Sequence, residues 1–83
     1  MPTIFRYRGY RFFFFSNEGY EPKHIHVRKN AETAKFWLEP EVILAYSYEM
    51  SPSELTEIEG IIREKKETFR EAWNVYFGSG SGG

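Results

Sequence analysis

The two histidines of this chain, His24 and His26, stand two positions apart at the start of the extended run HIHVRK. Side chains alternate between the two faces of a strand, so both rings and Arg28 are predicted to project to one side of a sheet. Paired imidazoles suit a divalent metal ion, an anion, or acid and base chemistry near neutral pH, because an unperturbed histidine titrates near pH ~6.5. The sequence therefore predicts a site on this strand without naming its substrate.

A metal site is one interpretation of the histidine pair. His24 and His26 are candidate ligands of zinc, nickel or copper, and Glu21 or Glu39 is the candidate third ligand. The chain has no cysteine, which excludes disulfides, zinc–thiolate sites and thiol nucleophiles. Because a His-x-His pair alone is a weak metal signal, no cofactor is predicted.

A metal-independent ribonuclease is another interpretation. In it His24 or His26 would be the catalytic base that removes the 2′-hydroxyl proton. The phosphate would be held by one of three basic side chains that belong to the same predicted sheet face: Arg11, Arg28 or Lys35. Surface histidines without any chemistry satisfy the same pattern.

The elements that must position the histidines are strands. Residues 3–7 and 10–16 are rich in β-branched and aromatic residues and flank Arg8-Gly9, which predicts a hairpin with a two-residue turn. In that register Tyr7 faces Tyr10, and further along Thr3 faces Phe14. Residues 16–23 read as a loop. Further strands are predicted at residues 24–29, 34–39 and 41–46, the last of which is also consistent with a bridging segment.

A helix is predicted after the strands. Ser51 is placed as its N-cap, Pro52 as its first residue and Glu54 as the partner that completes a capping box. Apolar residues at 3-4-3-4 spacing then continue to about residue 77, which favours one long amphipathic helix. A second capping-box pattern at residues 68–71 allows a break near Lys66.

Together these elements predict an α+β domain, with an antiparallel sheet of four to five strands packed on one face by a long C-terminal amphipathic helix. Alternation places one set of apolar residues in the core and leaves a basic and aromatic set on the other, exposed face. The predicted core contains Phe5, Phe12, Phe14, Ile25, Val27, Phe36, Leu38, Leu55, Ile58, Ile62, Phe69 and Trp73. The predicted exposed face contains Arg6, Arg11, Phe13, His24, His26, Arg28, Lys35 and Trp37.

Charge is unevenly distributed along the chain. The overall formal charge is −1, but residues 1–36 carry +4 and residues 37–83 carry −5. A basic face with aromatic side chains is typical of surfaces that bind single-stranded nucleic acid, and it also suits a partner protein. The expected partners are therefore a small protein or a second copy of the chain, or RNA or DNA.

The length of the chain limits the number of domains that it can form. At 83 residues it is one domain, predicted to span residues 1–77, with a flexible glycine and serine tail at residues 78–83. A domain this small buries only about 60% of its unfolded surface, so dense aromatic packing or a partner is expected to support it. No apolar run approaches the ~18 residues of a membrane span, so the chain is expected to be cytoplasmic.

Several segments of the chain resemble domain-of-unknown-function family 4160, a group of small bacterial proteins. The resemblance covers about 77 residues, and its motifs are specific in combination. They are MPTIFR (1–6), GYRFFF (9–14), SNE (16–18), EPKHIHV (21–27), AKFWL (34–38) and EAWN (71–74). The family often has proline where this chain has Lys23.

The resemblance implies a bacterial, cytoplasmic protein whose gene often lies beside that of a second small family, in an arrangement similar to a toxin–antitoxin pair. It supplies no catalytic residues. His24 and His26 match the paired histidines of the family, and Lys35 and Trp37 match its strand motif. The leading hypothesis from the sequence is an interaction module that binds a partner protein through the sheet face, with the ribonuclease and the metal-binding protein as alternatives.

Overall fold

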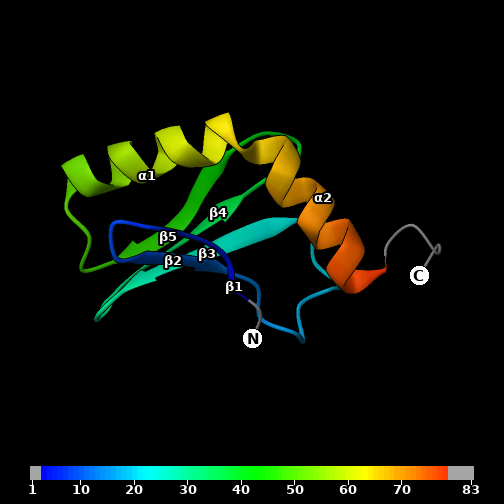
Figure 1. Cartoon of the computed structure of the whole chain (residues 1–83). Helices are drawn as coiled ribbons and strands as arrows, with labels where there is room; N and C mark the ends of the chain where they lie inside the picture. Colours follow the sequence, from blue (N-terminus) through cyan, green and yellow to red (C-terminus); the bar gives the residue numbers. More distant parts are fainter. Residues whose placement is uncertain (1–2, 79–83) are drawn as a thin grey trace.

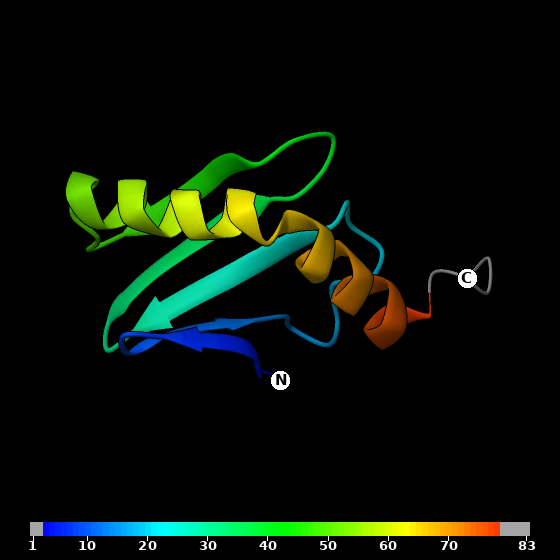
Figure 2. The ribbon, with the colours of Figure 1, turned by 45° about the horizontal axis from the view of Figure 1, so that its top comes forward.

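One antiparallel sheet and two helices make up the fold (Figure 1). The computed structural model describes residues 3–78. The strands lie in the order β1-β2-β3-β4-β5, and both helices cross the same face of the sheet (Figure 2). This arrangement confirms the predicted α+β class. The elements are β1 (Thr3–Tyr7), β2 (Tyr10–Phe13), β3 (His24–Lys29), β4 (Glu32–Trp37), β5 (Ile43–Tyr48), α1 (Pro52–Glu64) and α2 (Lys66–Phe77).

The first hairpin has the predicted turn but not the whole predicted register. Arg8 and Gly9 both have positive φ, 48° and 87°, as a two-residue turn of the primed type requires. Tyr7 pairs with Tyr10, as predicted, but Thr3 pairs with Phe13 because the register shifts between Thr3 and Phe5. The predicted pairing of Thr3 with residue 14 is therefore wrong, and β2 ends at Phe13 rather than at residue 16.

Strand boundaries on the other side of the sheet differ by two residues from those predicted. The β3–β4 turn contains only residues 30 and 31, with Asn30 at a φ of 56°, so pairing already begins between Lys29 and Glu32. As a result β4 begins and ends two residues earlier than the predicted 34–39. The fifth strand exists but runs over Ile43–Tyr48 rather than 41–46.

The C-terminal segment starts as predicted and then divides. Ser51 and Glu54 form the capping box, with both hydrogen bonds present. The segment is not one continuous helix, because the chain leaves helical geometry at Lys65, where φ is −107° and ψ is 18°, next to the break that the sequence allowed near Lys66. Figures 1 and 2 show α2 turning away from the axis of α1 at this point. Because of the bend, the apolar faces of α1 and α2 both pack on the twisted sheet, which one straight helix would cover only in part.

The core lies between the helices and the sheet, where it was predicted. The fully buried residues include Phe12, Phe36, Ile58 and Phe69, and the whole predicted set belongs to the core cluster, with Phe5 and Leu55 at its margin. Phe69 contacts the rings of Phe5 and Phe12 at centroid distances of 6.1 and 5.7 Å. Aromatic packing therefore joins α2 to the first hairpin.

The face of the sheet turned away from the helices is only partly open. Cross-strand pairs put Phe13, His26 and Lys35 in one row and Arg6, Arg11 and Arg28 in the next. The first row is buried, whereas Arg6 and Arg28 are exposed. The connection between β2 and β3 accounts for this difference, because it brings acidic side chains onto the first row.

Of the predicted tail, only Gly78 lies within the described residues, where it caps α2 with a left-handed φ of 65°. Residues 79–83 lie outside them. No helix within residues 3–78 is long and apolar enough to cross a membrane.

Candidate metal centre

His24 and His26 are the first and third residues of β3, on the face opposite to Ile25 and Val27, and both are buried. Their exposed fractions are 0% and 5%. The prediction that the pair lies on an exposed face is therefore wrong. Alternation is correct, since Ile25 and Val27 point into the core, but both faces of this strand are covered.

Aromatic rings enclose the two imidazoles. His24 lies edge-on to Trp73 of α2 with their centroids 4.9 Å apart, and His26 lies edge-on to Phe15 at 4.5 Å. The rings therefore sit in a low-polarity environment, in which any unpaired polar atom would be costly. Trp37 and Phe13 complete the walls, beside His24 and His26 respectively.

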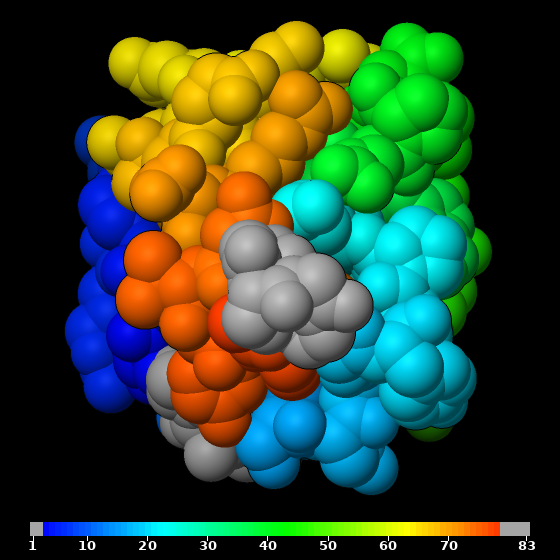
Figure 3. Space-filling model, turned by 90° about the vertical axis from the view of Figure 1, so that its right-hand side faces the viewer, coloured from blue at the N-terminus to red at the C-terminus, as the bar shows by residue number. Residues whose placement is uncertain are grey.

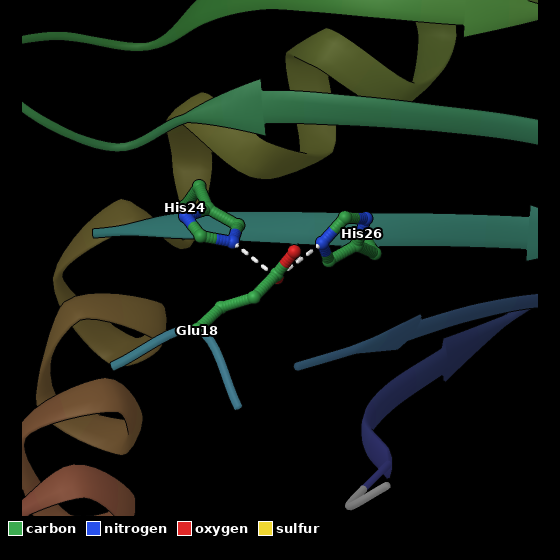
Figure 4. Close-up of side chains that lie close together, drawn as sticks. All are labelled: Glu18, His24 and His26. Atoms are coloured by element: carbon green, nitrogen blue, oxygen red, sulfur yellow. Dashed lines mark hydrogen bonds and ion pairs between the residues drawn. The ribbon is translucent and has the colours of Figure 1, made fainter. Parts of the chain in front are cut away.

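Glu18 connects the two histidines. Its Oε1 atom lies 2.7 Å from His24 Nε2 and 2.7 Å from His26 Nε2 (Figure 4). The carboxylate comes from the β2–β3 connection and reaches over the start of β3, with a side-chain exposure of 20%. The two imidazole nitrogens thus converge on one carboxylate oxygen, and ligand atoms of the three residues all lie within 4.8 Å of one another. Within residues 3–78 this is the one group of three such ligands.

The proton positions on His24 follow from its partners. Its Nδ1 atom lies 2.8 Å from the backbone oxygen of Pro22, and a carbonyl oxygen only accepts, so Nδ1–H donates. The neutral ring then presents a lone pair at Nε2 towards Glu18. Two facing acceptor atoms approach this closely only with a proton shared between them or with a metal ion bound to both.

Several charges surround the site. Burial raises the pKa of Glu18, but the hydrogen bonds with His24 and His26 outweigh it and hold that pKa below its ordinary value. Burial lowers the pKa of His26, against the opposing effect of Glu18. Next to the site Lys35 Nζ donates to Glu21 Oε1 at 2.9 Å, and this hydrogen bond holds the pKa of Glu21 below its ordinary value.

The segment that carries Glu18 is fastened at several points. Gly19 lies against Phe77, and a Cβ atom there would come within 2.5 Å of that ring, so the close approach requires glycine. Lys23 pairs with Glu39 at 3.0 Å, and its backbone oxygen accepts from the Leu38 N–H. Figure 3 shows the surface of this connection, azure to cyan, directly beside the last turns of α2 in orange.

The structure separates the candidate site residues into two groups. His24, His26, Lys35 and Trp37 lie together, with the Lys35 ammonium 4.4 Å from the centre of the Trp37 ring. The three candidate arginines, Arg6, Arg11 and Arg28, lie in the neighbouring cross-strand row.

The third ligand differs from both candidates proposed from the sequence. Glu21 pairs with Lys35 and lies 3.8 Å from His24 Nδ1, and Glu39 pairs with Lys23. Glu18 contacts the Nε2 atoms of both histidines. Two sequence signals point to Glu18, its place in the loop before His24 and its membership of the motif SNE, but Glu21 has the same two kinds of signal. Which loop carboxylate turns inwards is a matter of tertiary structure.

The pKa shifts predict a stability that falls in acid. The folded state lowers the pKa of both His26 and Glu18, so the unfolded chain binds more protons at low pH. With chelator present we expect a constant melting temperature above about pH 7, a decline that begins near pH 6.5 as His26 titrates, and a further decline near pH 4.5. The His26→Gln variant should lose the first decline. A melting temperature that rises between pH 7 and pH 5.5 would contradict the assignment.

Comparison with known proteins identifies a family. The sequence model of the family described as "Domain of unknown function (DUF4160)" matches residues 9–74, which include the whole of the site and most of both helices. No curated protein and no solved structure matches the chain. The bacterial origin, the cytoplasmic location and the gene arrangement implied by the resemblance stay predictions.

Proposed function

We propose that this chain, which belongs to the family described as domain of unknown function (DUF4160), binds a divalent transition-metal ion through Glu18, His24 and His26. The observation that carries the proposal is that ligand atoms of two buried histidines and one glutamate lie within 4.8 Å of one another. Two imidazole nitrogens and a carboxylate oxygen form a ligand set typical of Zn²⁺ and related ions.

The hydrogen bond of His24 to Pro22 supports metal binding over a purely structural role. Metal-binding histidines usually donate the other ring N–H to a carbonyl or carboxylate, which fixes the tautomer and aims the lone pair. His24 does this with Pro22 O at 2.8 Å. A metal ion would take the place of the proton that the contact between His24 and Glu18 otherwise needs, and binding would release protons from the site.

The location of the ligands indicates what the ion would do. His24 and His26 belong to β3, and Glu18 belongs to the connection that covers it. An ion among them would fasten this connection to the sheet. Because the two rings are enclosed by aromatic side chains, the arrangement suits a structural or sensing site more than an open catalytic one.

Burial also bears on the ribonuclease alternative. A base must reach the proton it removes to within about 3 Å, or through one water. His24 and His26 are 0% and 5% exposed and turn their Nε2 atoms towards Glu18. Nothing in this geometry supports the ribonuclease, and we do not propose it.

Titration with Zn²⁺ tests the proposal. At 100 times the dissociation constant, an ion that binds only the folded chain adds about 2.7 kcal/mol to the free energy of unfolding, and the melting temperature should rise by roughly 10–20 °C. Calorimetry in buffers of different ionisation enthalpy should show proton release on binding. Substitution with Co²⁺ reports the coordination geometry from its visible absorption.

Two glutamine variants separate a ligand from a neighbouring charge. Glu18→Gln keeps the shape and a hydrogen-bonding group but removes a ligand, and we expect its Zn²⁺ affinity to fall by at least about 100-fold. Glu21→Gln removes a carboxylate that pairs with Lys35 and lies 3.8 Å from His24 Nδ1, the ring atom bonded to Pro22 and not the proposed ligand atom, so it should retain most of the affinity. Equal affinities in the two variants, or no binding of Zn²⁺ or Co²⁺ by the parent chain, would overturn the proposal.

A further inference from the structure

Strand β5 closes the sheet at one edge, and it is exposed along its whole length. It pairs with β4 on one side, and no strand within residues 3–78 pairs with its other side. All six of its residues are exposed. The outer row of backbone N–H and C=O groups is therefore open to another extended chain.

The two edges of the sheet differ in how they resist such pairing. The opposite edge, β1, carries the charged Arg6 near its centre and an irregular register between Thr3 and Phe5, both of which discourage pairing. Strand β5 has the sequence ILAYSY, without charge or proline. Four of its large apolar or aromatic side chains are between 37% and 64% exposed: Ile43, Leu44, Tyr46 and Tyr48.

Three of these exposed side chains, Ile43, Tyr46 and Tyr48, lie on one face of the sheet. The register shift opposite Lys35 and Phe36 leaves Ala45 as an extra residue. Ile43 therefore lies opposite Trp37 and Tyr46 opposite Lys35, on the face away from the helices. An added strand would find apolar and aromatic neighbours on this face.

Acidic residues stand at both ends of β5. Glu41 precedes it and Glu49 follows it, both are exposed, and neither has an ion-pair partner within residues 3–78. They are eight positions apart in the sequence, so the extended segment between them spans at most about 26 Å. The surrounding half of the chain, residues 37–83, has a formal charge of −5.

We infer that β5 binds an extended segment of a partner protein as a sixth strand. The segment has apolar side chains at alternate positions and a Lys or Arg at each end. Backbone hydrogen bonds to β5 would supply much of the affinity, and Glu41 and Glu49 would select basic ends. A second copy fits less well, because an antiparallel β5–β5 pair related by a two-fold axis places Glu41 of each copy near Glu49 of the other.

Labelled nine-residue peptides test this inference by fluorescence anisotropy, both with chelator and with Zn²⁺ so that the result is independent of the metal site. One peptide has alternating valine and threonine between terminal lysines, and its control has terminal glutamates. We expect the lysine peptide to bind about tenfold more tightly at low salt. Successive backbone N–H groups of a strand point alternately to its two sides. Methylating every second nitrogen of the peptide should abolish binding when those N–H groups face β5, and methylating the other nitrogens should not.

Charge reversal in the protein completes the test. The double variant Glu41→Lys with Glu49→Lys should prefer the glutamate peptide. Glu64→Lys with Glu71→Lys, which changes exposed helix residues by the same total charge, should keep the parent preference. Equal binding of both peptides by all proteins, or equal effects of the two methylation patterns, would overturn the inference. A dimer in sedimentation that Tyr46→Glu dissociates would also overturn it, in favour of a second copy on β5.

Discussion

Replacement of Phe69 by alanine is expected to lower the free energy of unfolding by about 3–5 kcal/mol. The side chain is fully buried and contacts the rings of Phe5 and Phe12, so its loss leaves a cavity between α2 and the first hairpin. Such a loss approaches the whole stability of a small domain, which is about 5–15 kcal/mol. Urea unfolding followed by circular dichroism gives the measurement, with the midpoint as the readout.

Val75→Ala is the matched control for Phe69→Ala. It lies on the same helix, α2, but its side chain is 74% exposed, so its effect should stay within about 0.5 kcal/mol. If the two variants had the same midpoint, Phe69 would not be a core residue and the packing of α2 on the sheet would be wrong.

Removal of both imidazoles is the second change with a large expected effect. With chelator present, the double change His24→Ala and His26→Ala should lower the free energy of unfolding by at least about 3 kcal/mol. It leaves space among the surrounding aromatic rings, and it deprives Glu18 Oε1 and the Pro22 carbonyl of their hydrogen-bond donors. Exposed histidines, as the sequence alone suggests, would cost no more than about 1 kcal/mol.

Tyr20→Ala provides the comparison for the histidine variant. Tyr20 belongs to the same connection between β2 and β3 but is 84% exposed, so its removal should leave the unfolding midpoint almost unchanged. A double histidine variant as stable as Tyr20→Ala would show that the connection does not cover β3 in solution. Both the buried site and the metal proposal would then fail.

Local signals in the sequence determined the elements that depend on near neighbours. Arg8-Gly9 predicted the two-residue turn, because glycine tolerates the positive φ found there. The capping box of Ser51 and Glu54 predicted the start of α1. Alternation along β3 predicted which residues enter the core, since a strand that turned Ile25 and Val27 outwards would leave them in water. Each of these features is decided within a few residues.

Features that depend on distant contacts were not determined by the sequence alone. The sequence allowed a break near Lys66 but did not decide it, and the bend occurs at Lys65 because the apolar face must follow the sheet beneath it. The connection between β2 and β3 had the largest consequence, because it covers a face of β3 that the sequence predicted to be exposed and so buries the site.

The choice of Glu18 over Glu21 and Glu39 shows the reason most clearly. Glu18 and Glu21 shortly precede the histidines in the sequence, Glu39 follows them at the end of the next strand region, and the side-chain chemistry of all three is the same. Lys35 pairs with Glu21, and Lys23 pairs with Glu39. The close packing of Gly19 against Phe77 helps to place Glu18 over the imidazoles. The residue types that make a metal site chemically feasible were therefore fixed by the sequence. Their convergence was decided by tertiary packing, because a loop carboxylate takes its direction from partners far along the chain.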